Sequence, residues 1–242
     1  MSRRRFDASQ LRITRGALTV AGLQIGLSLV FMLSSGGTKQ TIGDWLVATP
    51  TSVFREGRVW TLATSVFLEL DFLSLLLGLF MLWAFIPTLE RFWGTARFWR
   101  FFAITSLVGT LVGTGVGLLL GRDEPIVGLS PFIYASMVAF GIVYAKQPVQ
   151  FFGVLPLTGR QLMYGFIGFL VLYVVLQQAW DKGAAFAGAM IVAAIMTSKR
   201  ASPGLAWKRW KIARARARLS VIEGGALGPK PKPKKRDDKY LN

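Results

Sequence analysis

A long apolar segment from Val66 to Thr88 constrains the fold of this chain more than any other feature. At 1.5 Å of rise per residue, a helix over this segment is long enough to cross the hydrocarbon core of a bilayer, which is about 30 Å thick. Trp60 precedes the segment and Trp93 follows it, and tryptophan is enriched where membrane helices meet water. We therefore predict a transmembrane helix here.

Further apolar segments predict an all-α, polytopic membrane protein with a bundle of six transmembrane helices. The hydrophobic fraction of 52% is too high for an ordinary soluble domain. The predicted spans are residues 16–35, 66–88, 101–120, 128–145, 161–177 and 183–197. Residues 1–15 then form a basic N-terminus, residues 16–198 the membrane domain and residues 199–242 a basic tail.

The connections between these spans differ in composition. Residues 36–63 predict a loop with short amphipathic helices in the outer membrane interface, because Gly and Pro punctuate half-apolar pieces. Residues 90–100 predict a tight turn, and Glu90 is expected to pair there with Arg91 or Arg97. Asp181 and Lys182 predict a second turn, on the opposite side.

The distribution of charge predicts that both termini are cytoplasmic. The chain has 29 Lys and Arg against 12 Asp and Glu, a formal net charge of +17. Few of these cations fall in connections predicted for the opposite side: Lys39, Arg55, Arg58, Arg122 and Lys182. The positive-inside rule therefore supports an even number of spans with both ends in the cytoplasm. The compact architecture favours a bacterial cytoplasmic membrane.

The sequence contains neither Cys nor His. Disulfides, thiolate and imidazole metal sites, and every mechanism that needs an imidazole base are therefore excluded. We expect no cofactor and no bound metal. Nucleic acid is not an expected partner, because no recognisable nucleic-acid-binding fold accompanies the basic charge.

The second predicted helix and its flanks resemble the rhomboid family, whose active members are intramembrane serine proteases with the motifs W-R-x-x-T, F-x-H, H-x-x-x-N and G-x-x-x-E. Matching residues are Trp60, Thr64, Phe67, Glu90 and Gly94. Other motif positions differ. Thr61 stands in place of the Arg, and Glu69 and Ser74 stand in place of the two His. Gly78 replaces the Asn, and Ile86 replaces the first Gly of G-x-x-x-E.

The resemblance extends over roughly residues 15–198. Gly128-Leu129-Ser130 is similar to the family's G-x-S-G, in which the Ser is the nucleophile, and residues 185–189 are similar to A-H-x-G-G. The resemblance implies that Phe186 replaces the base and Gly78 an oxyanion donor. Pro131 removes a backbone N–H after the Ser. A serine nucleophile needs a base and aimed donors, so this chain resembles the family's inactive members.

We therefore predict a rhomboid-like pseudoprotease, which binds transmembrane clients or assembles in a membrane complex without cleavage. Ser130 is then a helix N-cap, with Pro131 in the first turn. One alternative is an active serine endopeptidase that uses Ser130 with Glu69 or Asp71 as an atypical base. Another is a structural subunit of a membrane complex. A transporter is less favoured, because paired broken helices are not evident.

Three further groups of residues have predicted roles in binding or packing. Glu69 and Asp71 are candidate client contacts, or else are solvated at headgroup depth. Gly109, Gly113, Gly117 and Gly121, at four-residue spacing, together with Gly188, predict close helix packing within the bundle or an oligomer interface. A basic aromatic helix over residues 203–219 is expected to bind anionic headgroups or a cytoplasmic partner. Its contributing residues are Trp207, Lys208, Arg209, Trp210, Lys211 and Arg214.

Overall fold

The computed structural model divides the chain into two compact units, residues 1–199 and residues 200–242. It describes residues 13–151 and 155–198, and in the second unit only Lys211 and Arg214. Both of these tail residues are helical and exposed. The other predicted headgroup-binding residues, Trp207, Lys208, Arg209 and Trp210, lie outside the described residues.

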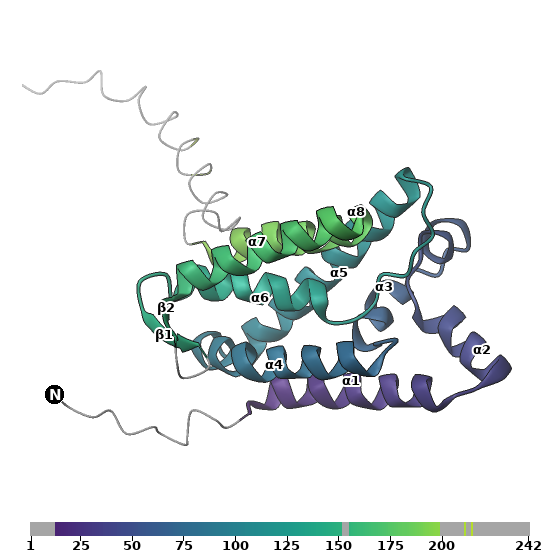
Figure 1. Cartoon of the computed structure of the whole chain (residues 1–242), viewed down its shortest axis with the longest axis horizontal. Coiled ribbons are helices and arrows are strands. Elements are labelled where there is room, and N and C mark those ends of the chain that lie inside the picture. The colour runs from purple at the N-terminus through teal and green to yellow at the C-terminus, as the bar shows by residue number, and fades with distance from the viewer. Residues whose placement is uncertain (1–12, 152–154, 199–210, 212–213, 215–242) are drawn as a thin grey trace, which may run out of the picture. The chain divides into compact units, whose positions relative to one another are not determined.

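Helices dominate the first unit (Figure 1). They are α1 (Arg15–Leu33), α2 (Gly36–Leu46), α3 (Thr61–Thr64), α4 (Phe72–Trp93), α5 (Thr95–Leu119), α6 (Ser130–Val143), α7 (Gly159–Gln177) and α8 (Trp180–Thr197). An antiparallel hairpin, β1 (Pro148–Phe151) and β2 (Leu155–Thr158), separates α6 from α7. Among the described residues, α1, α4, α5 and α7 are long and apolar enough to cross a membrane, and α6 is a shorter apolar helix.

Apart from the short helices α2 and α3, the described helices run alternately in opposite directions between two ends of the bundle (Figure 1). These helices are α1, α4, α5, α6, α7 and α8. At the end that we call the hairpin end, Phe92 of α4 lies against Tyr144 after α6, and Arg97 of α5 donates to the carbonyl of Met196 in α8. At the opposite end, which we call the loop end, Arg122 donates to the carbonyl of Gln178. The starts of α1 and α7 and the end of α8 therefore share the hairpin end.

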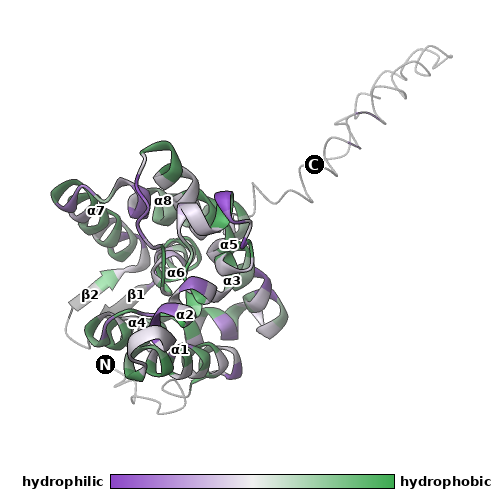
Figure 2. Cartoon of the chain, turned by 90° about the vertical axis from the view of Figure 1, so that its right-hand side faces the viewer, coloured by the Kyte–Doolittle hydropathy of each residue, from purple (hydrophilic) through white to green (hydrophobic). Residues whose placement is uncertain are grey.

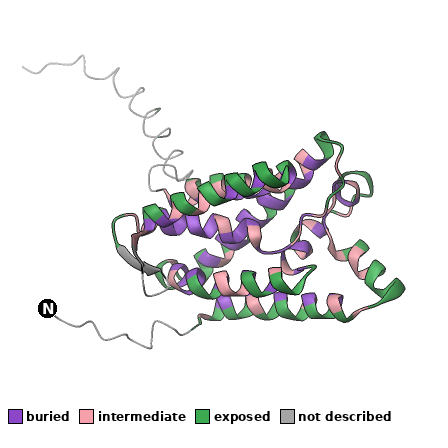
Figure 3. Cartoon of the chain, in the orientation of Figure 1, coloured by how far each residue is buried: buried purple, intermediate pink, exposed green. Residues whose placement is uncertain are grey.

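The short helix α6 lies in the middle of the bundle (Figure 2). Most of its residues are buried, whereas the long helices α1, α4 and α7 have exposed apolar faces (Figure 3). Phe132 of α6 packs against Phe98, Phe101 and Phe102 of α5. Such edge-on aromatic pairs fill space at favourable geometry. The exposed apolar faces fit a hydrocarbon surrounding rather than water.

A seam of glycines holds α5 close to α8. A Cβ built on Gly113 would lie 2.6 Å from Ala185 Cβ, and one on Gly109 would lie 3.1 Å from Ala189 Cβ. From the other helix, a Cβ on Gly188 would meet Val112 at 3.1 Å. Small residues let helices approach closely in lipid, where dispersion contacts replace the hydrophobic effect.

Gly117 and Gly121 differ from this pattern. A Cβ on Gly117 would meet Pro50 Cγ at 2.9 Å, so Gly117 packs chiefly against the connection after α2. Gly121 was expected to extend the packing stripe, and this prediction is wrong. α5 ends at Leu119, and Gly121 has a φ of +66° with nothing within 4 Å of an added Cβ. It serves the turn instead.

Several predicted boundaries are wrong for local reasons. The span predicted at residues 66–88 is not one helix, because Leu68–Asp71 interrupts it and α4 begins only at Phe72. The turn predicted at residues 90–100 is reduced to Gly94, whose φ of +78° separates α4 from α5. Asp181 lies in the first turn of α8 and is 1% exposed, so it does not form a surface turn.

The glycine seam generates a prediction with an internal control. Gly113→Ala should destabilise the bundle by about 1–3 kcal/mol, because the added methyl overlaps Ala185 in a well-packed interface. Gly115→Ala, two residues away, adds the same methyl where nothing lies within 4 Å. It should leave stability unchanged or raise it by up to about 1 kcal/mol through helix propensity. Thermal unfolding in mild detergent measures both, and equal midpoints for the two variants would contradict the seam.

Candidate functional site

Glu69 lies at the centre of the candidate site, on the extended segment that precedes α4. Its side chain is buried, with 6% exposed. Its backbone N–H donates to Ser28 Oγ at 2.9 Å, and its Oε1 accepts from Gln24 Nε2 at 3.3 Å. Both partners are buried and lie one turn apart on α1. The segment before α4 is therefore fixed to the middle of α1.

The same carboxylate reaches the start of α6. It lies against the backbone N–H of Leu129, with which it interacts favourably, and Gly128 N donates to the carbonyl of Ser65 at 2.9 Å. Leu129 is the N-cap residue of α6 and has no side-chain cap of its own. Glu69 thus places a carboxylate at the start of α6, where the local sequence lacks a side-chain cap and the helix dipole is positive. We call Gln24, Ser28, Ser65 and Glu69 the polar cluster.

Gly128 is required by this arrangement. Its φ is +85°, and a Cβ built on it would overlap the carboxylate of Glu69. Gly78 of α4 also faces the polar cluster, because an added Cβ would lie 3.5 Å from Gln24 Nε2 and 3.9 Å from Glu69 Oε1. The absence of a side chain at Gly78 therefore gives room to a buried amide and carboxylate.

Ser130 does not hold the position predicted for it. It is the first residue of α6, whereas Leu129 is the N-cap, so the predicted N-cap role is wrong. Ser130 is half-buried, and in the part of the chain that the structure describes no hydrogen bond joins its Oγ to Glu69. The structure therefore brings the predicted serine and acid near each other, through Leu129, without forming a nucleophile and base pair.

Asp71 and Phe186 have structural partners. Asp71 is exposed and is the N-cap of α4, where its Oδ1 accepts from the backbone N–H of Ser74 at 2.8 Å. That hydrogen bond lowers the pKa of the Asp71 carboxyl below its usual value. Phe186 is buried, and its ring lies 5.0 Å from the ring of Tyr134, one turn beyond Ser130. Phe186, at the position for which the predicted resemblance implies a base, therefore belongs to an aromatic stack.

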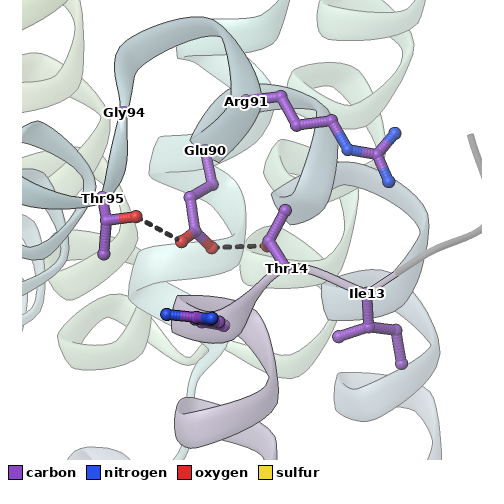
Figure 4. Close-up of a pocket in the computed structure, with 7 residues that line it drawn as sticks. Ile13, Thr14, Glu90, Arg91, Gly94 and Thr95 are labelled. Atoms are coloured by element: carbon purple, nitrogen blue, oxygen red, sulfur yellow. Dashed lines mark hydrogen bonds between the residues drawn. The ribbon is translucent and has the colours of Figure 1, made fainter.

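Glu90 is a second buried glutamate, and it was predicted to form an interfacial pair with Arg91 or Arg97. It is 3% exposed and caps α1, so its predicted surface position is wrong and Arg97 is not its partner. Its oxygens accept from Gly16 N and Ala17 N, each at 3.0 Å. They also accept from the hydroxyls of Thr14 and Thr95, as the dashed lines in Figure 4 show. Arg97 instead lies over the ring of Trp93, with its Cζ 5.5 Å from the ring centroid.

Sequence reasoning missed Gln24, Ser28 and Ser65. The available signal was the i, i+4 spacing of Gln24 and Ser28 in an otherwise apolar helix, which places both on one face. Gln24 Oε1 and Ser65 Oγ are buried and have no hydrogen-bond partner among the described residues. Within residues 13–151 and 155–198, no group of three His, Cys, Asp or Glu side chains could hold a metal.

The contact between Gly128 and Glu69 can be tested by a matched pair of substitutions. Gly128→Ala and Gly121→Ala both place a methyl on a residue with positive φ, which costs about 1–2 kcal/mol each. Only Gly128→Ala also displaces a buried carboxylate, so it should cost a further 1–3 kcal/mol or so. Unfolding in detergent compares them, and equal losses of stability would argue against a close contact between Glu69 and α6.

The family of this chain is identified by its membrane domain. No curated protein matches the sequence. Residues 15–198, which run from the first residue of α1 to just beyond α8, match the family described as "Eukaryotic integral membrane protein (DUF1751)". The predicted bacterial membrane conflicts with this eukaryotic family and is corrected here. With its long apolar helices and a match over most of its length, the chain belongs to this family of eukaryotic integral membrane proteins.

Proposed function

We propose that this protein is a rhomboid-like pseudoprotease that binds a transmembrane client, or a subunit of a membrane complex, without cleaving it. One observation carries the proposal. Glu69, the acid near Ser130, is committed to Gln24 on α1 and to the Leu129 N–H at the start of α6. A general base needs a free lone pair within hydrogen-bond reach of the hydroxyl that it deprotonates.

The other catalytic requirements are also unmet at the matching positions. Phe186 cannot accept a proton, and its ring stacks on Tyr134. Gly78 has no side-chain donor for an oxyanion, and Pro131 has no backbone N–H. Because acyl transfer needs all of these groups together, the retained Ser130 alone does not support proteolysis.

Six crossings with both termini in the cytoplasm fit this proposal. The six alternating helices bring the start of α1 and the end of α8 to the hairpin end. Basic residues gather at that end: Arg15, Arg91, Arg97, Arg100, Lys146 and Arg160. Among the described residues there, Glu90 is the only acid, and it is buried. The positive-inside rule assigns such an end to the cytoplasm.

The proposed client surface lies along α4 and α7, which flank α6. Phe85 of α4 meets Phe166 of α7 edge-on, with ring centroids 6.1 Å apart. Toward the loop end, Phe72 and Leu73 of α4 are each about two-thirds exposed. Glu69 is buried and cannot be a contact on this surface, so Asp71 remains as the polar contact. An apolar helix could pack here with its polar flank at Asp71.

A second candidate function is proteolysis with an unusual base. Its support is the position of the Glu69 carboxylate, which lies against Leu129, the residue before Ser130. A rearrangement that released Glu69 from this N–H would bring an acid to the serine.

Photocrosslinking in native membranes tests the two functions. A photoreactive residue at position 72 should capture the same intact membrane partner from the native protein and from Ser130→Ala. Asp71→Asn should lower its recovery by about two- to fivefold, the size expected for one exposed polar contact. The control position is Leu119, which is 85% exposed at the same end but on α5, and it should not capture this partner.

Two outcomes would contradict the proposal. A partner recovered as a fragment with Ser130 and intact with Ser130→Ala would establish proteolysis. Equal capture from positions 72 and 119 would mean that α4 does not form a specific client surface. Mass spectrometry of the crosslinked products distinguishes both from the expected result.

A further inference from the structure

The polar cluster holds a buried carboxylate among uncharged neighbours. Glu69 is 6% exposed, and within residues 13–151 and 155–198 no ion pair joins it to a Lys or Arg side chain. The other members of the cluster, Gln24, Ser28 and Ser65, are neutral and fully buried. A charge inside a membrane protein is costly, so such acids pair with a group of opposite sign. The cluster therefore favours a positively charged ligand.

Two further oxygen atoms of the cluster are available to such a ligand. Gln24 Oε1 and Ser65 Oγ are buried and have no hydrogen-bond partner in the part of the chain that the structure describes. The Nε2 atom of the same planar amide donates to Glu69 Oε1 at 3.3 Å, so Gln24 Oε1 lies close to the carboxylate. Ser65 is held beside them, because its carbonyl accepts from Gly128 N and Gly128 faces Glu69. Carboxylate, amide and hydroxyl oxygens are the ligands that hard cations prefer.

The backbone next to the cluster adds a carbonyl oxygen. The 3₁₀ turn at Ser65–Phe67 ends in an extended segment before α4 begins. At the end of this turn, the carbonyl of Phe67 accepts from Ser28 Oγ at 3.5 Å, so this oxygen also lies at the cluster. Interrupted helices expose carbonyl oxygens in this way, and such oxygens coordinate sodium ions in membrane transporters.

The charge of the carboxylate and the space beside it select the type of cation. One carboxylate balances one positive charge, whereas a divalent ion would leave the buried cluster with a net charge. A Cβ built on Gly78 of α4 would lie 3.5 Å from Gln24 Nε2 and 3.9 Å from Glu69 Oε1. Gly78 therefore leaves room for a methyl-sized group beside the amide and the carboxylate. A small monovalent ion fits both conditions.

We propose that the polar cluster binds a sodium ion, held by the Glu69 carboxylate, Gln24 Oε1 and Ser65 Oγ. The sequence predicts no bound metal because it lacks Cys and His, but sodium takes oxygen ligands instead. The ion leaves Glu69 in place and joins α1 to the segment before α4. Its binding is independent of Ser130 and of the proposed client surface.

Thermal unfolding of the purified full-length chain in detergent tests the site. Midpoints are measured in sodium, potassium or choline chloride at equal ionic strength, so that general screening is the same in each. Sodium should raise the midpoint of the native chain in a saturable way, because it binds only the folded cluster. At about ten times its Kd, it should lower the unfolding equilibrium constant about elevenfold, which corresponds to a rise of roughly 3–6 °C. Potassium should stabilise less, since the larger ion does not fit the space at Gly78.

A matched pair of serine variants locates the effect. Ser65→Ala and Ser136→Ala each remove a buried hydroxyl that has no partner among the described residues. Ser136 lies outside the cluster, about two turns along α6 toward the hairpin end. Ser65→Ala should raise the Kd for sodium roughly tenfold, whereas Ser136→Ala should leave it unchanged. Glu69→Gln keeps the shape of the side chain and removes its charge, so it should abolish the response to sodium.

Three outcomes would each overturn the proposal: equal stabilisation by sodium and choline, equal stabilisation by sodium and potassium, or equal responses to sodium in the two serine variants. If Glu69→Gln does not fold, the serine pair decides, because neither hydroxyl has a hydrogen bond to lose among the described residues. Equilibrium binding of radiolabelled sodium to the native chain and to Ser65→Ala should show the same tenfold or so difference in Kd as the midpoints.

Discussion

A helix that begins in a buried part of a protein exposes backbone N–H groups that need partners. Two buried glutamates meet this constraint here. Glu90 accepts hydrogen bonds from the N–H groups of Gly16 and Ala17 at the start of α1, and Glu69 lies against the N–H of Leu129 at the start of α6. Each acid comes from a distant part of the chain, so each cap also fixes one element against another.

Glycine makes these buried carboxylates possible. A Cβ on Gly16 would lie 2.7 Å from Glu90 Oε2, and a Cβ on Gly128 would overlap Glu69. Gly113 likewise lets α5 approach α8 closely, but here the neighbouring group is the apolar side chain of Ala185 rather than a carboxylate. Close backbone approach therefore provides both the packing and the polar satisfaction of this bundle, and it leaves the carboxylates little freedom to take on other roles.

The sequence predicts the features that depend on local pattern. The apolar runs locate the long helices, with α7 displaced by only two residues at its start, and the four-residue glycine spacing identifies the face of α5 that meets α8. The break before α4 was not predicted, because apolar residues continue through it. Asp71 nevertheless caps α4, so the helix begins at Phe72 despite the apolar residues before it. The polar cluster was missed because Gln24 and Glu69 are 45 residues apart. Composition carries no information about the organism, and for that reason the predicted bacterial membrane was wrong.

The polar cluster also explains why a serine and an acid can lie close together without chemistry. In an active site, hydrogen bonds aim a base at its nucleophile, whereas here they hold Glu69 toward Gln24 and the Leu129 N–H. Moving Glu69 to Ser130 would leave a backbone donor unsatisfied in a buried setting, at a cost of about 1–3 kcal/mol. The stability of the α6 start therefore opposes any role of Glu69 as a base, in keeping with the binding function proposed above.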